Sequence, residues 1–100
     1  MPVMLIARFD GDVADLIRAY DRAHALIGSQ GGAVSSGELR HHCATSEKSL
    51  YIIGVWESED HVRRRWSSEE FKETLTSVGF PAPDQAEITI LQLHEIEPPL

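Results

Sequence analysis

The chain has 100 residues, 42% of them hydrophobic, and a formal net charge of −7 at neutral pH. This length and composition are typical of one globular domain, so we expect residues 1–100 to fold as a single unit. The acidic balance argues against nucleic-acid and membrane partners, because both surfaces are bound mainly through Lys and Arg.

The cysteine count, the hydropathy and the absence of certain motifs predict the cellular location and the cofactor content. Cys43 is the single cysteine, so an intrachain disulfide and a paired CxxC site are excluded. No segment reaches the roughly 20 apolar residues of a membrane span, and the amino terminus lacks the pattern of a secretory signal. Motifs such as a Gly-rich phosphate loop or HExxH are absent. We expect a soluble, cytoplasmic protein with no cofactor and no metal.

The first half of the chain predicts a strand, a helix and a second strand. Residues 3–9 are apolar and β-branched, and Asp10-Gly11-Asp12 ends this strand in a turn. Asp12 is a good N-cap for a helix reaching Gly28, whose apolar face carries Val13, Leu16, Ile17, Tyr20 and Ile27. Residues 28–32 form a flexible connection, and residues 34–45 form a weaker, partly exposed strand.

The second half repeats this order. Residues 50–56 are apolar on both alternating faces, which indicates a strand in the middle of a sheet. Ser58 caps a helix, and Ser67 with Glu70 forms a second capping box, so we expect a helix that breaks near Ser67. After Pro81-Ala82-Pro83, residues 86–96 alternate as a last strand.

The resulting order, βαββαβ, predicts an α+β ferredoxin-like sandwich. Two interleaved β-α-β units give a four-stranded antiparallel sheet of order 4-1-3-2 with both helices on one face. Three of the strands carry apolar residues on both faces, so a lone chain would expose a large apolar patch. We therefore expect a homodimer in which two sheets pair face to face.

Two motifs point to a family. A strand ends in Val55-Trp56-Glu57-Ser58-Glu59, and Trp66 precedes Ser67-Ser68-Glu69-Glu70-Phe71-Lys72. These stretches resemble the dimeric α+β barrel superfamily, and within it the antibiotic-biosynthesis-monooxygenase-like (ABM) proteins. The resemblance implies cofactor-free oxidation of polyketide quinones, haem degradation or an unknown activity. Of the haem-degrading branch's features the chain keeps Trp66, but its first strand has no Asn and Leu75-Thr76-Ser77 supplies no His ligand.

The resemblance also implies one pocket per chain, between the open sheet face and the broken second helix. Trp66 would be a wall for a planar ligand there, or an ordinary core residue. The side chains that we expect to contact an apolar or aromatic small-molecule ligand are Met4, Ile6, Trp66, Phe71 and Ile90.

Arg8 and His94 are the candidate catalytic residues. Arg8 shares the alternation face of Met4 and Ile6, and would hold an anion in the pocket or pair with Asp10 or Glu57 at the strand end. His94 would remove a proton and would meet His41 or His42 across the dimer. A metal site built from these histidines is short of ligands. The Arg63-Arg64-Arg65 run fans over about 200° of helix surface, which indicates a solvated helix end.

Three functions stay open on this basis. The first is a cofactor-independent monooxygenase acting on a small aromatic or polyketide-like substrate. The second is a non-enzymatic dimer that binds a small ligand or has a structural role, and the third is haem binding or degradation. Fold resemblance alone does not choose among them, because one fold carries many functions.

Overall fold

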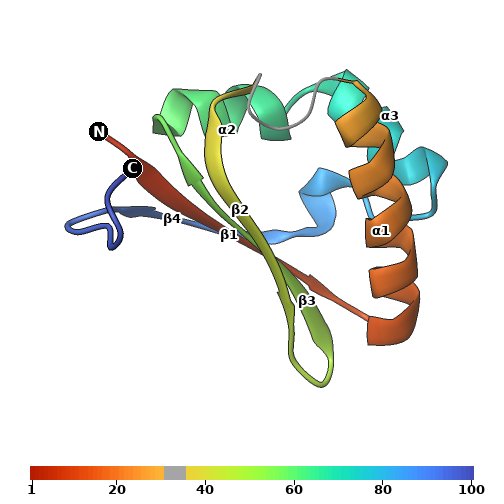
Figure 1. The fold of residues 1–100 in the computed structure, drawn as a ribbon. Helices are drawn as coiled ribbons and strands as arrows, with labels where there is room; N and C mark the ends of the chain where they lie inside the picture. The colour runs from red at the N-terminus through yellow and green to blue at the C-terminus, as the bar shows by residue number, and fades with distance from the viewer. Residues whose placement is uncertain (31–35) are drawn as a thin grey trace.

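The computed structural model describes residues 1–30 and 36–100, which form one sheet covered by helices (Figure 1). The elements are β1 (Val3–Asp10), α1 (Val13–Ser29), β2 (Glu38–Thr45), β3 (Ser49–Trp56), α2 (Glu59–Trp66), α3 (Glu69–Ser77), a short 3₁₀ turn (Pro83–Gln85) and β4 (Glu87–Gln92). The order βαββαβ is confirmed, with the second helix broken into α2 and α3. Within the described residues no helix is long and apolar enough to span a membrane.

The four strands form an antiparallel sheet of order β2-β3-β1-β4, which is the predicted order read from the other edge. Ala7 in β1 pairs with Ile52 in β3 and Ile88 in β4, so these residues share one face of the sheet. The helices cover that face, as Figure 1 shows. Side chains one residue along, such as Ile6 and Ile53, lie on the opposite, open face.

The helix-covered face holds the core. The larger cluster joins α1 and α3 to the sheet, and a smaller one lies under α2 around Leu5 and Val62. Phe9 is 1% exposed at the centre of the larger cluster, where its ring meets Phe80 edge-on with centroids 4.8 Å apart. Of the predicted helix face, Leu16 is buried while Ile17 stays 40% exposed, because the helix turns it toward solvent.

Serine and aspartate side chains set the helix starts. Asp12 accepts a hydrogen bond from the Asp15 backbone N–H at 3.0 Å, and Ser58 accepts from that of His61 at 3.3 Å, as the capping pattern predicted. The predicted cap at Ser67 is wrong by one residue. Ser68 accepts from the Phe71 N–H at 3.2 Å, while the Ser67 hydroxyl donates back to the Arg63 carbonyl and so finishes α2.

Two predicted strands are longer than the observed ones. β2 begins at Glu38, and residues 34 and 35 of the predicted strand lie outside the described residues, as do residues 31 and 32 of the predicted connection. β4 ends at Gln92 rather than at residue 96. Gln92 pairs with Val3, the first residue of β1, and the preceding Pro2 has no N–H to extend the ladder. The chain beyond β4 therefore leaves the sheet.

Candidate functional site

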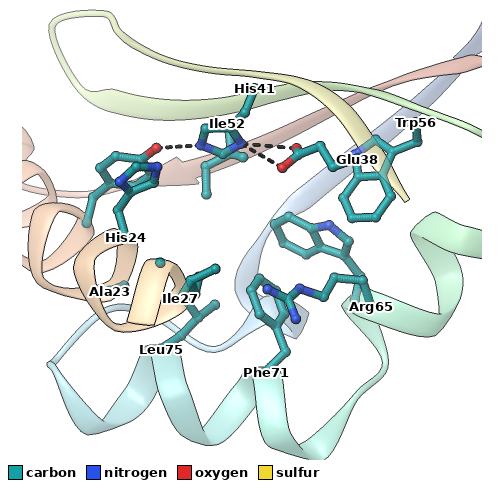
Figure 2. A pocket seen from close by; sticks show the side chains of 13 residues that line it. Ala23, His24, Ile27, Glu38, His41, Ile52, Trp56, Arg65, Phe71 and Leu75 are labelled. Carbon is teal, nitrogen blue, oxygen red and sulfur yellow. Dashed lines mark hydrogen bonds and ion pairs between the residues drawn. The ribbon is translucent and has the colours of Figure 1, made fainter. Parts of the chain in front are cut away.

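An apolar cavity of about 220 Å³ lies between the sheet and the helices that cover it. Its floor comes from β2 and β3, and its walls come from α1, the end of α2 and α3 (Figure 2). Its lining residues are mostly aliphatic and aromatic: Tyr20, Ala23, His24, Ile27, Gly28, Glu38, His41, Ile52, Trp56, Arg65, Trp66, Phe71 and Leu75. Apolar walls with a few polar groups are typical of small-molecule sites.

An irregularity in β2 brings two of the polar groups together. Glu38 pairs with Trp56 and Arg40 pairs with Val55, so Leu39 is an extra residue on the β2 side of the ladder. In a regular strand, residues 38 and 41 would point to opposite faces, because side chains alternate. The extra residue restores Glu38 to the face of His41. Both side chains therefore line the cavity.

Glu38, His41 and Tyr20 form a chain of hydrogen bonds, drawn as dashed lines in Figure 2. The His41 Nδ1 lies 3.1 and 3.0 Å from the two carboxylate oxygens of Glu38, so its N–H donates to them. The Nε2 then accepts from the Tyr20 hydroxyl, whose oxygen lies 2.5 Å away. The carboxylate thus fixes which ring nitrogen of His41 can receive a proton.

Burial affects both ends of the hydrogen-bond chain, Glu38 and Tyr20. Glu38 is 5% exposed, and His41 is its hydrogen-bond partner within the described residues. Burial, followed by the charges of Cys43 and Glu38, raises the pKa of Tyr20 well above its ordinary value. Tyr20 therefore stays a neutral hydroxyl at physiological pH, which can donate or relay a proton but does not keep a negative charge.

Arg65 supplies a positive charge at the cavity wall. Its guanidinium carbon lies 4.6 Å from the centroid of the Phe71 ring, a cation–π contact. Figure 2 shows this contact across the cavity from His41. Burial lowers the pKa of Arg65, although Glu38 and Glu70 act in the opposite direction. The guanidinium stays charged at neutral pH, because arginine starts from a very high pKa.

Two of the predicted ligand contacts, Trp66 and Phe71, do line this cavity. Their rings meet edge-on with centroids 5.3 Å apart. Met4, Ile6 and Arg8 do not, because the alternation of β1 turns them to the open face while Leu5 and Ala7 face the helices. The cavity lies between the sheet and the broken second helix, as the resemblance implied, but on the helix-covered face of the sheet and not on the open one.

The remaining predicted site residues also lie away from the cavity. Arg8 pairs with Asp10 at 3.1 Å and with Glu87 at 2.6 Å, as in the alternative in which it pairs at the strand end. Ile90 packs on the cluster under α2, and His94 is exposed beyond the end of β4. Catalytic roles for Arg8 and His94, and ligand contacts by Met4, Ile6 and Ile90, stay predictions that the geometry of this cavity does not use.

The histidines do not gather into a metal site. Within the described residues no group of three or more His, Cys, Asp or Glu side chains could hold a metal ion. His41 and His42 are neighbours in β2 and so point to opposite faces. His41 instead stacks on His24 with ring centroids 5.6 Å apart, and α1 supplies that second ring.

Sequence reasoning missed four of the polar residues that line the cavity, namely Tyr20, Glu38, His41 and Arg65 in these roles. Arg65 could have been found, because three consecutive arginines spread over about 200° cannot all face solvent on a helix that packs against a sheet. Glu38 could not have been found, because no residue pattern in the Glu38–Thr45 strand indicates the extra residue at Leu39.

The fold and the cavity together define an α+β ferredoxin-like protein with the fold of ABM proteins. SnoaB, a cofactor-independent oxygenase from Streptomyces nogalater, is similar over 98% of both chains, with 22% identity and a TM-score of 0.65. Rv0793 from Mycobacterium tuberculosis is similar over 97% of this chain and 99% of its own, with 17% identity and a TM-score of 0.66.

A third solved structure carries the ABM name itself. It is the "putative antibiotic biosynthesis monooxygenase" from Caulobacter crescentus, with 15% identity over 94% of this chain and 91% of its own and a TM-score of 0.66. No protein-family model and no curated protein sequence matches the chain. At these identities the likeness establishes the fold, which confirms the predicted ABM-like architecture.

Proposed function

We propose that this protein is a cofactor-independent oxygenase of a small aromatic or polyketide-like molecule, which binds in the cavity between the sheet and the broken second helix. The observation that carries the proposal is the combination of apolar walls with one relay, Glu38–His41–Tyr20, and one guanidinium, Arg65. The likeness to SnoaB, which is described as a cofactor-independent oxygenase, supports the same reaction class.

The proposed chemistry starts with a proton transfer. An enolisable substrate CH₂ group next to a ring carbonyl loses a proton to the Tyr20 oxygen as Tyr20 passes its own proton to His41 Nε2. Glu38 stabilises the imidazolium that forms, and Arg65 stabilises the substrate anion. The anion then gives electrons to O₂. One oxygen atom stays on the substrate carbon as C=O and the other leaves as water, so CH₂ and O₂ become C=O and H₂O.

The cavity walls contribute by excluding water. Trp66 and Phe71 offer flat apolar surfaces to an aromatic substrate, and a low-polarity site strengthens the attraction between Arg65 and an anion. Because the substrate anion itself reduces O₂, this reaction calls for no cofactor.

Oxygen uptake with a panel of anthrones and other enolisable phenolic ketones tests the proposal. We expect His41→Gln to lose on the order of 10²- to 10⁴-fold in rate, because it removes the proton acceptor. His42→Gln is the matched control, since this neighbour faces away from the cavity. Tight binding of panel members without O₂ uptake or product would overturn the proposal in favour of a non-enzymatic binding module.

We also propose that the functional unit is a homodimer formed through the open face of the sheet. Ile6 and Ile53 pair with each other on that face, and Leu91 is 47% exposed on it. Covering such an apolar surface with a second copy is favourable, because a chain of this size buries a limited core.

A further inference from the structure

A second cavity, of about 370 Å³, opens next to the first and has a different character. Its lining is polar and comes from Ser36, Gly37, Glu57, His61, Arg64, Arg65 and Ser68. Arg65 is the residue that lines both cavities. The apolar cavity and the polar cavity therefore share Arg65 as a wall.

On the polar cavity, the carboxylate of Glu57 has an ion-pair partner, while the two arginines have none within the described residues. Glu57 lies 3.2 Å from His61 Nε2, and the Nδ1 of the same ring lies 2.7 Å from the Ser58 hydroxyl. Arg64 donates to the Asp60 carbonyl at 3.4 Å, and Arg65 stacks on Phe71. Within the described residues neither arginine has a carboxylate within 4 Å, although the chain as a whole carries a net charge of −7.

Arg64 is exposed and Arg65 is half-buried, and neither forms an ion pair with a carboxylate of the described residues, so both can bind an anion from outside. Their neighbour Arg63 shows the ordinary arrangement, since it pairs with Glu59 at 2.5 Å on the surface of α2. A guanidinium binds a carboxylate through two parallel N–H donors. Glu57 puts one negative charge on the same cavity, which favours a singly charged carboxylate over a doubly charged phosphate.

We propose that the ligand of this protein is an aromatic carboxylic acid, whose ring system fills the apolar cavity while its carboxylate lies in the polar cavity against Arg64 and Arg65. The inference rests on the proposed function, since it assumes an aromatic ligand in the inner cavity, and it adds the acidic substituent. Arg65 then has two tasks, because it contacts the ring system on one side and the carboxylate on the other.

A matched pair of probes tests this inference without any turnover. 2-Naphthoic acid and its neutral amide have the same shape, and calorimetric titration under nitrogen measures the affinity of each. We expect the acid to bind wild-type protein about tenfold or more tightly than the amide, because a charged hydrogen bond is lost with the amide. This preference should shrink at high salt, since part of it is electrostatic.

Three variants test which arginine causes the preference for the acid over the amide. Arg64→Gln should reduce the acid's advantage several-fold and weaken the amide less, because the acid loses an ion pair and the amide loses at most a hydrogen bond to a neutral acceptor. Arg65→Gln should weaken both probes, since it also removes the contact with Phe71. Arg63→Gln makes the same charge change on the same helix and should keep the wild-type preference.

The outcomes separate this inference from the proposed function. Equal affinity for acid and amide in the wild-type protein, no binding of either, or an unchanged preference in Arg64→Gln overturns the aromatic acid. An acid preference that depends on Arg64, in a protein that consumes no oxygen with any aromatic acid, would uphold the ligand class and overturn the oxygenase.

Discussion

Gly54 occupies the middle of the central strand β3, where a side chain would collide with the hydrogen-bond chain. A Cβ on this residue would overlap Glu38 Oε2 and would lie 2.8 Å from Trp56 Nε1. Glycine inside a strand often marks such a close approach. The space that Gly54 leaves open is therefore what admits the buried carboxylate beside the indole.

Gly54→Ala should push the Glu38 carboxylate out of its place and break its bond to His41. We expect a loss of about 1–3 kcal/mol in the free energy of unfolding, the usual range for overpacking a core. Urea denaturation measures it. Gly28→Ala is the control, because a Cβ there meets nothing within 4 Å and an added helical alanine should be neutral or slightly stabilising. Equal stabilities for the two variants would contradict this account.

The thiol of Cys43 provides a pH test at the same scale. Burial, followed by the charge of Asp21, raises the pKa of this thiol above its ordinary value. The reactive species is the thiolate, so alkylation by iodoacetamide should need a higher pH than alkylation of a free cysteine. Asp21→Asn should move the pH profile part of the way back down. A midpoint at or below that of free cysteine would contradict a raised pKa for the Cys43 thiol.

The elements could be read from the sequence where local signals set them. Asp12 and Ser58 cap their helices through side-chain oxygens, and such bonds depend on near neighbours in the chain. Strand pairing depends on distant residues instead, so neither the extra residue at Leu39 nor the end of β4 at Gln92 followed from residue type. The cavity lies between the sheet and the second helix as predicted, but Met4 and Ile6 do not line it, because the resemblance gave the fold and not the direction of each side chain.

At the break between α2 and α3, a single residue sets where the second helix begins. Ser67 and Ser68 are adjacent and chemically identical, yet Ser68 caps α3 while Ser67 donates to the Arg63 carbonyl. The break positions Trp66 and Phe71, on either side of it, as neighbouring cavity walls.

Ser68→Ala should therefore cost about 1 kcal/mol in the free energy of unfolding, because the Phe71 N–H loses its acceptor. Ser67→Ala is a matched control that keeps the cap, and surface changes of this kind usually stay within about 0.5 kcal/mol. Thermal and urea denaturation of the two variants give the comparison. A larger effect at Ser67 than at Ser68 would place the cap at the residue that the sequence first suggested.

At the scale of the whole molecule, the open face of the sheet is covered at one end by the chain's own tail. Arg40 lies on that face of β2 and donates to the carbonyls of Pro98 and Pro99, at 2.8 and 3.2 Å. The tail leaves the far edge strand β4, so it crosses the sheet to reach Arg40. Val55, which pairs with Arg40, is 6% exposed.

The rest of that face is the surface that we propose a second copy covers, and Ile53 lies near its centre between Ile6 of β1 and His42 of β2. A carboxylate placed there would be desolvated in a dimer but hydrated in a single chain, so Ile53→Glu should dissociate the dimer. Ile17→Glu makes the same change at a 40% exposed position on α1 and should leave the assembly intact. Light scattering should give wild type and Ile17→Glu twice the 11.2 kDa of one chain, and Ile53→Glu the mass of one chain.

Wild-type protein at the mass of a single chain at micromolar concentration would overturn the dimer. The cavity would be unaffected by that result, because its described lining lies on the other face of the sheet.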